Sequence, residues 1–402
     1  MLIAQIEYQE ITLTDIVIVG AKRTPIGSFQ GQFAPVSSQD LGAAAIRAAI
    51  DQSGIDAADL SEVIMGCVLP AGLGQAPARQ AAIKADVPVS VGCMTINKVC
   101  GSGLKAVMLA HDAIKAGSSE IAVAGGMESM TNAPFMLPKA RSGMRMGHGE
   151  VIDHMFWDAL QSPYDKQMMG MFGEMCADKY QFSREQQDAF AIASVERAQR
   201  AMSDGSFADE ITPVTVTSRR GASVFEQDEE PPRCNLEKVP GLRPAFRKDG
   251  TVTAANSSKI SDGAAATVIM TSDEAERRGI EPLVRIVAQV THAHEPEWFT
   301  TAPSVAVAKV VKKAGWSLED VDLFEINEAF ASVTMAAMAD NQLDHAKVNV
   351  NGGACALGHP VGASGARILV TLIHALRNRG LKRGVASLCL GGGEAVAVAV
   401  EV

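Results

Sequence analysis

The stretch Asn97-Lys98-Val99-Cys100-Gly101-Ser102-Gly103 brings a thiol, two glycines and the start of a helix together. Residues 89–96 before it are rich in Val, Met, Thr and Ile and predict a strand, and residues 104–115 after it predict an apolar helix. Cys100 therefore lies on a strand-to-helix turn. We expect the glycines to permit a sharp backbone there and the free amides of the first helical turn to favour thiolate over thiol. Taken alone, the stretch is more typical of a buried structural cysteine beside a glycine turn.

Strands and helices alternate on both sides of this turn. Strands are predicted at 15–20, 61–68 and 120–126, and helices at 38–52 and 78–85. This alternation is typical of an α/β protein whose sheet is mostly parallel and covered on both faces.

The alternation of predicted strands and helices stops between about 131 and 257, where methionines and then charged residues accumulate. One helix is predicted there, from Ser183, which suits an N-cap, to Ser203. We interpret this segment as an inserted subdomain. It divides the chain into a first half (1–130), the insertion (131–257) and a final part (258–402) that completes the first sheet and holds the second half.

The second half repeats the first. Gly54 corresponds to Gly315, the segment 101–103 to 363–365, and Gly117 to Gly380, so the spacing between equivalent residues stays nearly constant. A duplication of this kind places equivalent strand ends around a pseudo-twofold axis, and a shared site is expected where they meet.

Composition excludes several classes of function. The 402 residues carry a net charge of −10, which argues against a nucleic acid or an anionic membrane as the main partner. No apolar run is long enough to span a membrane, and residues 1–13 resemble neither a signal nor a transit peptide, so a cytoplasmic protein is expected. The seven cysteines are widely spaced with no Cys-x-x-Cys pair, which fits reduced thiols and predicts no metal site.

Four stretches end predicted strands or directly follow them: 97–103, Asn327-Glu328-Ala329-Phe330, Gly358-His359-Pro360 and Cys389-Leu390-Gly391-Gly392-Gly393. Each is a weak signal alone. Together with Gly126-Met-Glu-Ser-Met130, Asn349-Val-Asn-Gly-Gly353 and the run 356–365, they resemble the thiolases, from about residue 13 to the C-terminus. The resemblance implies duplicated α/β halves with layered, mostly parallel or mixed sheets.

The resemblance also implies acyl transfer through an acyl-cysteine. Cys100 would attack a thioester or β-ketoacyl carbonyl, and His359 would accept its proton. Cys389 would remove a proton from acetyl coenzyme A, a task that suits a thiol because its reference pKa lies near the working pH. One oxyanion site would use His359 and a water held by Asn327, and the other the backbone amides of Cys100 and Gly391.

The same resemblance assigns residues to the substrate. It places Phe246 and Ser258 against the coenzyme, and Met169 and Phe330 along the acyl end. Arg233 is a candidate for a phosphate or else a solvated arginine. Phe299 stands where short-chain biosynthetic thiolases usually carry methionine, and a ring there is expected to shorten the acyl pocket, unless it is simply core. Cys355 replaces an expected aliphatic residue and is interpreted as a small buried hydrophobe.

The function expected is the reversible condensation of two acetyl-CoA to acetoacetyl-CoA and CoA, or thiolysis of short 3-ketoacyl-CoA. Coenzyme A thioesters are substrates, and no tightly bound cofactor is expected. The loop 137–152 resembles the loop that joins dimers in tetrameric thiolases, which predicts a homotetramer. The alternatives are a degradative thiolase of broad or longer chain length, a carrier-protein condensing enzyme, a non-catalytic thiolase-like lipid carrier and a cysteine hydrolase.

Overall fold

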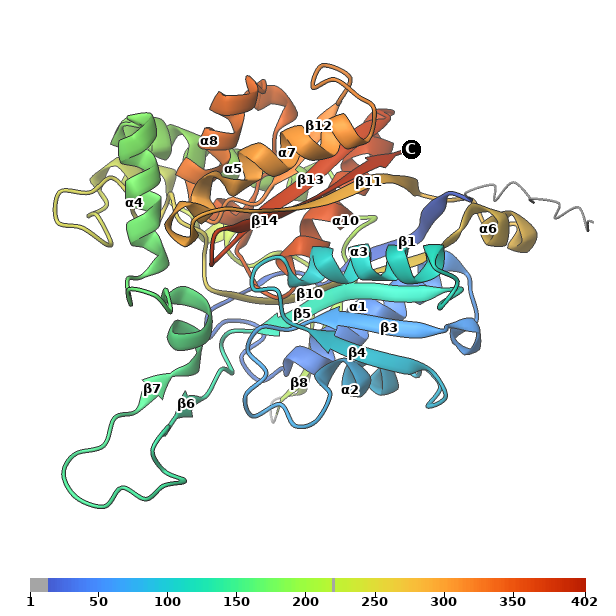
Figure 1. Ribbon diagram of the computed structural model, residues 1–402, viewed down its shortest axis with the longest axis horizontal. Helices are drawn as coiled ribbons and strands as arrows, with labels where there is room; N and C mark the ends of the chain where they lie inside the picture. Colours follow the sequence, from blue (N-terminus) through green and yellow to red (C-terminus); the bar gives the residue numbers. More distant parts are fainter. Residues whose placement is uncertain (1–13, 219–220) are drawn as a thin grey trace, which may run out of the picture.

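Two similar α/β units, joined through neighbouring strands, form the body of the protein (Figure 1). The computed structural model describes residues 14–218 and 221–402. The N-terminal stretch 1–13, for which no targeting peptide is predicted, lies outside the described residues. In the described part of the chain, no helix is both long and apolar enough to cross a membrane.

The N-terminal unit has the strand order β4-β3-β5-β10-β1, and the C-terminal unit has the matching order β12-β13-β14-β11. The strands of the first are β1 (Ile16–Arg23), β3 (Glu62–Gly66), β4 (Gly92–Ile96), β5 (Ala122–Ser129) and β10 (Ser261–Thr271), with the short β2 (Gly27–Ser28) pairing with β10. Those of the second are β11 (Val284–Ala293), β12 (Leu323–Ile326), β13 (Arg383–Leu390) and β14 (Glu394–Glu401). The shared order confirms the duplicated α/β fold.

The two half-sheets, which β1 and β11 join into one ten-stranded sheet, are mixed. Parallel pairing joins β3 to β4 and β5, and β12 to β13, whereas β10 and β14 pair antiparallel with their neighbours. The alternation of strands and helices alone suggested a mostly parallel sheet. That expectation is wrong because the last strand of each unit returns antiparallel beside the strand before it, β10 after the insertion and β14 through a tight turn.

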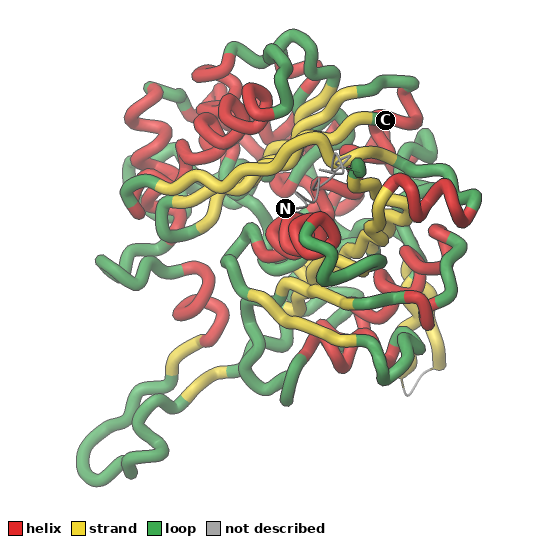
Figure 2. Tube along the Cα trace, turned by 45° about the vertical axis from the view of Figure 1, so that its right-hand side comes forward, coloured by secondary structure: helices red, strands yellow, loops and turns green. Residues whose placement is uncertain are grey.

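Helices cover both faces of each sheet, as Figures 1 and 2 show. The outer helices are α1 (Ser38–Ser53), α2 (Pro77–Lys84), α7 (Ala302–Lys313) and α8 (Ala331–Asn341), with the short α6 (Ser272–Arg278) at one end. Between the two sheets lie α3 (Ser102–Lys115) and α10 (Ser364–Arg379), which contact each other. Of these helices, α1, α2 and α3 were predicted, and each agrees with its predicted range to within a few residues.

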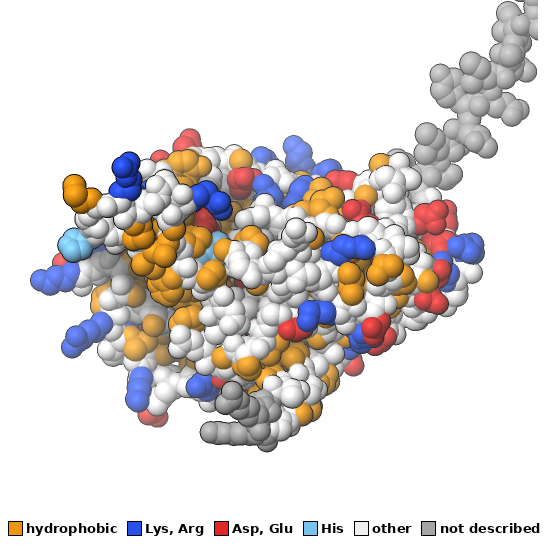
Figure 3. Space-filling model, turned by 90° about the horizontal axis from the view of Figure 1, so that it is seen from below, with side chains coloured by type: hydrophobic (Ala, Val, Ile, Leu, Met, Phe, Trp, Pro, Cys, Tyr) orange, Lys and Arg blue, Asp and Glu red, His pale blue; other side chains and the backbone are white. Residues whose placement is uncertain are grey.

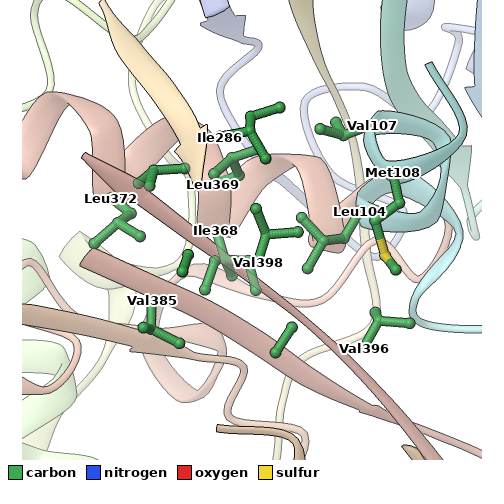
Figure 4. Close-up of a cluster of buried hydrophobic side chains, with 14 of the residues drawn as sticks. Leu104, Val107, Met108, Ile286, Ile368, Leu369, Leu372, Val385, Val396 and Val398 are labelled. Carbon is green, nitrogen blue, oxygen red and sulfur yellow. The ribbon is translucent and has the colours of Figure 1, made fainter. Parts of the chain in front are cut away.

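The main core forms around the two central helices (Figure 4). Leu104 and Val107 of α3 lie near Ile368 and Leu369 of α10, and Val396 of β14 belongs to the same buried cluster. Burying each such aliphatic side chain contributes about 1.5–3 kcal/mol. The core therefore holds the two units together and fixes the starts of both helices.

The insertion holds more structure than its sequence predicted. Its elements are β6 (Phe135–Met136), β7 (Ile152–Asp153), η2 (Phe156–Leu160), α4 (Met169–Tyr180), α5 (Arg184–Ser203), β8 (Val214–Ser218), β9 (Gly221–Phe225), η3 (Pro231–Arg233) and η4 (Leu236–Gly241). The helix predicted from Ser183 is confirmed, with Ser183 and Gln186 forming a capping box. Helix α4 was missed because no side-chain cap marks its start.

Candidate active site

The backbone turns sharply just before Cys100, but not at the glycines. Val99 has φ +46°, an unusual value for a β-branched residue, whereas Gly101 has φ −81°. The Ser102 hydroxyl holds the turn: it accepts from the Lys98 N–H at 2.8 Å and donates to the Val99 carbonyl at 2.6 Å. Such strained conformations persist only where the surroundings fix them, and they cluster at functional sites.

Glycine is needed at 103 for a different reason. A Cβ there would lie 2.7 Å from the backbone nitrogen of Ala366, and a Cβ on Gly365 would lie 2.4 Å from that of Leu104. The first turns of α3 and α10 therefore touch through their backbones. This contact places the turn that carries Cys100 beside the segment that carries His359.

The Cys100 thiol lies in a mostly apolar setting. Burial raises its pKa to about 11, although hydrogen bonds from the backbone N–H groups of Gly391 and of Cys100 itself act in the opposite direction. The backbone amides therefore favour the thiolate, as expected, but desolvation outweighs them, so Cys100 is a thiol in the free protein. Cys100 needs a base to take its proton.

His359 has the state that such a base requires. Its Nδ1 lies 2.6 Å from the Ser364 Oγ, and that hydroxyl donates to the Pro360 carbonyl at 2.9 Å. Nδ1 must then carry the hydrogen, which leaves Nε2 unprotonated. Among the described residues, this buried Nε2 has no hydrogen-bond partner. Burial first, and then Arg367, lowers the pKa of His359 to about 3, so the ring is neutral at neutral pH.

The second thiol, Cys389, is the penultimate residue of β13 and lies close enough to Cys100 for the two groups to interact. Burial raises the pKa of Cys389 well above its ordinary value, and the neighbouring Cys100 raises it further. The turn that follows uses Gly392 and Gly393, both with positive φ. A Cβ on Gly391 would only touch Met169 at 3.6 Å and Val99 at 3.8 Å, so the fold itself leaves room there. Glycine at 391 keeps open a space beside the Cys100 sulfur.

Asn327 follows β12 and is buried, with 1% of its surface exposed. Its side-chain oxygen and nitrogen have no partner among the described residues, which is costly in an apolar interior unless water or a ligand binds there. The next residue, Glu328, is fixed by Ser194 and Asn349, whose groups lie 2.7 and 2.8 Å from its carboxylate oxygens. The free amide of Asn327 thus sits on a rigid support.

A pocket of about 620 Å³ opens from His359 to the surface. It gathers five predicted substrate residues on its wall: Met169, Arg233, Phe246, Ser258 and Phe330. Gly391 and Met169 also line a smaller adjoining pocket of about 220 Å³.

Two predicted residues, Phe299 and Cys355, stand apart from the wall of the larger pocket. Phe299 is buried at 4% exposure, packs edge to face on Phe172 with ring centroids 5.7 Å apart, and shares an apolar cluster with Cys389. Cys355 is fully buried, as predicted. Arg233 does reach the pocket, but its side chain is 60% exposed and pairs with Glu229 at 2.9 Å.

Glu128, a buried carboxylate in the motif 126–130, has a structural task that its sequence pattern did not indicate. It accepts hydrogen bonds from the backbone of Val68, Leu69 and Gly362 at 2.9, 3.2 and 2.9 Å. Burial raises its pKa to about 7. Glu128 therefore ties the first unit to the loop behind His359. Ser364 was also missed, although its place in the internal repeat, equivalent to Ser102, could have singled it out.

Comparison with known proteins agrees with this geometry. Residues 16–273 match the family described as "Thiolase, N-terminal domain", and residues 280–402 match "Thiolase, C-terminal domain". The chain belongs to the thiolase family.

Individual relatives match over nearly the whole chain. The acetyl-CoA acetyltransferase of Pseudomonas aeruginosa is 50% identical over 96% of this chain and 99% of its own length. That of Cupriavidus necator is 49% identical over 97% and 100%. The crystal structure of the Bacillus anthracis acetyl-CoA acetyltransferase superposes with a TM-score of 0.94 at 42% identity, covering 97% of this chain and 99% of that one.

Proposed function

We propose that this enzyme catalyses the reversible condensation of two acetyl-CoA to acetoacetyl-CoA and CoA, and the thiolysis of short 3-ketoacyl-CoA. The observation that carries the proposal is that a neutral imidazole with a free Nε2 lines one apolar pocket, and that two interacting thiols, Cys100 and Cys389, lie by Gly391 on the adjoining pocket, which shares Met169 with the first. This set can both form an acyl-cysteine and generate a carbanion beside it.

In the first half-reaction, the His359 Nε2 accepts the Cys100 proton as the sulfur attacks the thioester carbonyl. The tetrahedral intermediate collapses, CoA leaves with the proton that His359 returns, and an acetyl group remains on Cys100. Because the thiol has a high pKa and the imidazole a low one, the ion pair forms only as charge moves to the sulfur.

In the second half-reaction, Cys389 acts as thiolate, a form that acetylation of Cys100 favours because it removes the neighbouring charge that raises the pKa of Cys389. It removes a methyl proton from a second acetyl-CoA, and the resulting carbanion attacks the acetyl carbonyl. The bond to Cys100 breaks, acetoacetyl-CoA forms, and the proton on Cys389 passes to the departing Cys100 sulfur, which restores both groups. The backbone N–H groups of Cys100 and Gly391, which approach the sulfur in the free protein, suit the oxyanion of this step. Asn327 would hold a water that, with His359, stabilises the enolate oxygen.

The inserted unit, residues 131–257, would bind much of the coenzyme. Phe246 packs edge to face on Phe330 with ring centroids 6.2 Å apart, which gives the pocket a firm apolar wall, and Ser258 lies on the same lining next to this wall, its N–H bonded to the Ala329 carbonyl. Arg233 lies on the pocket lining and would bind a phosphate of the coenzyme in place of its ion pair with Glu229.

The direct test is to incubate purified protein with acetyl-CoA and to measure acetoacetyl-CoA and free CoA. Wild type should form both in equal amounts. Cys389→Ala should still accept acetyl on Cys100 yet form no acetoacetyl-CoA. Release of free acetate in place of acetoacetyl-CoA would indicate a cysteine hydrolase and overturn the proposal.

We further propose a preference for acyl chains of about four to six carbons, because the rigid Phe172–Phe299 pair closes the apolar cluster around Cys389. Crowding by added methylenes costs roughly 1–3 kcal/mol in a small pocket. Phe299→Met should widen the range. The measurement is kcat/KM from acetoacetyl-CoA to 3-ketohexadecanoyl-CoA, and values that hold steady or rise with length would instead support the degradative alternative.

The loop between β6 and β7 projects from the body (Figures 1 and 2). It exposes Leu137, Met144, Met146 and Val151, and Figure 3 shows hydrophobic and basic side chains mixed at this end of the molecule. We propose that this loop joins two dimers of the chain into a tetramer. Native mass should halve when residues 139–149 are replaced by a short Gly-Ser linker, whereas an unchanged mass would contradict the proposal.

A further inference from the structure

A second pocket, of about 470 Å³, lies at the end of α10 that is remote from the active site. Helix α10 begins at Ser364, which contacts His359, and ends at Arg379 on the pocket wall. Its 16 residues span about 24 Å. Arg197 and Arg200, near the end of α5, complete a group of three arginines around the same space.

The positive charge of these arginines is poorly balanced. Among the residues that the structure describes, none of the three forms an ion pair with a carboxylate, whereas Arg184 on the same helix α5 pairs with Asp188 at 2.6 Å. Asp204 is the one carboxylate on the lining, and it accepts hydrogen bonds from Ser206. Three positive charges against one negative charge leave the cleft with a net positive charge, which concentrates anions there.

The side chains are also held in place. Arg197 donates to the Val348 carbonyl at 2.7 Å, Arg200 to the Val350 carbonyl at 2.8 Å, and Arg379 to the Asn351 side chain at 3.1 Å. Each guanidinium has five N–H groups, so donors remain for a ligand. Because the arginine side chains are already ordered, binding a ligand would cost little further side-chain conformational entropy.

We propose that this pocket binds a small phosphate-bearing anion, with a diphosphate group bridging Arg200 and Arg379. Planar guanidinium groups pair two N–H donors with phosphate oxygens, and several arginines around one space favour a multiply charged ligand over a single carboxylate. The side-chain amide of Asn378 lies on the same lining and adds a neutral donor. This site is separate from the coenzyme pocket and does not depend on the reaction proposed above.

Residues 348–351, which accept hydrogen bonds from the three arginines, connect the pocket with the active site. Asn349, within that segment, accepts from the Ile326 N–H and donates to the Ile326 carbonyl, both at 2.8 Å, and donates to Glu328. Ile326 and Glu328 flank Asn327. An anion that rigidifies residues 348–351 would therefore also act on the support of Asn327.

The test is calorimetric titration of the full chain with pyrophosphate, and separately with ADP, with saturating CoA present to fill the coenzyme pocket. Chloride at equal ionic strength serves as the salt control. Wild type should bind one equivalent. Arg200→Gln and Arg379→Gln should each weaken binding by at least about tenfold, since a hydrogen bond to a charged group contributes about 1.5–3 kcal/mol. Tighter binding of ADP than of pyrophosphate would identify a nucleotide diphosphate as the ligand.

Arg277→Gln is the matched control, because Arg277 is an exposed arginine on α6 that pairs locally with Glu274. It should leave binding unchanged. Unfolding midpoints in chloride establish that the variants are folded, and Arg379→Lys should bind more tightly than Arg379→Gln because it retains the charge. Equal affinity in wild type and both Gln variants, or heat that chloride reproduces, would overturn the proposal.

Discussion

The turn before α3 carries Cys100, and the equivalent turn before α10 is preceded by His359. Both are organised by the first serine of the helix. Ser102 binds the backbone of its own turn, whereas Ser364 binds the Pro360 carbonyl and also His359. The duplication thus supplies one scaffold twice and brings the copies into backbone contact at Gly103 and Gly365. Each copy then contributes a different reactive group, which neither half could provide alone.

Among the predicted changes, removing the His359 imidazole from the segment before α10 should lower kcat the most. His359→Ala should lower kcat by about 10³-fold, within the range of general-base contributions. Steady-state condensation assays measure it, with unfolding midpoints to establish the fold. His148→Ala, in the exposed β6–β7 loop, is the control and should retain activity. A loss of less than tenfold in His359→Ala would mean that another base serves Cys100.

The reactivity of the Cys100 thiol, on the turn before α3, should depend on pH. Because burial raises the pKa of Cys100 to about 11, the free protein holds a thiol below that pH, and the thiolate fraction grows with pH. Alkylation of Cys100 by iodoacetamide should therefore rise about 100-fold from pH 7 to pH 9, tenfold for each pH unit below the pKa. Peptide mass spectrometry follows the rate. A plateau near pH 8 would show that the helix amides prevail over burial.

The backbone contact between the turns should matter for stability. Gly103→Ala places a Cβ against the Ala366 nitrogen, and overpacking of this kind costs about 1–3 kcal/mol. The free energy of unfolding in urea should fall by this amount. Gly241→Ala, whose Cβ would meet nothing within 4 Å, is the matched control. Equal stability of the two variants would mean that the turns separate at little cost.

Ser364, unlike Ser102, contacts a reactive side chain, so its removal should change the rate and the pH dependence of catalysis. Ser364→Ala removes the acceptor of the His359 Nδ1 hydrogen, and loss of one hydrogen bond of about 1 kcal/mol lowers kcat about fivefold. It should also change the pH profile of kcat, since the ring is no longer held in one tautomer, and Ser364→Thr should restore both. An unchanged profile in Ser364→Ala would reduce Ser364 to a structural role.

Much of this arrangement was predictable from the sequence. The repeat, the alternation of elements and the motifs identified the duplicated fold, the family and the thiols, because each rests on local patterns. The charge states were not predictable. The helix start near Cys100 suggested a thiolate, yet burial by residues distant in sequence decides the pKa. The left-handed backbone of Val99 was missed for a different reason: the neighbouring glycines were expected to take the sharp turn, whereas the Ser102 hydroxyl, three residues along, holds it at Val99.

The measurement that tests the account most directly is the site of acetylation. Wild-type protein is incubated with acetyl-CoA, quenched in acid and digested, and the acetylated peptide is sequenced by mass spectrometry. The account predicts an acetyl group on Cys100 alone, present also in Cys389→Ala and absent in Cys100→Ala. An acetyl group on Cys389 in wild type would contradict the account, because the two turns would then not build the nucleophile and its base.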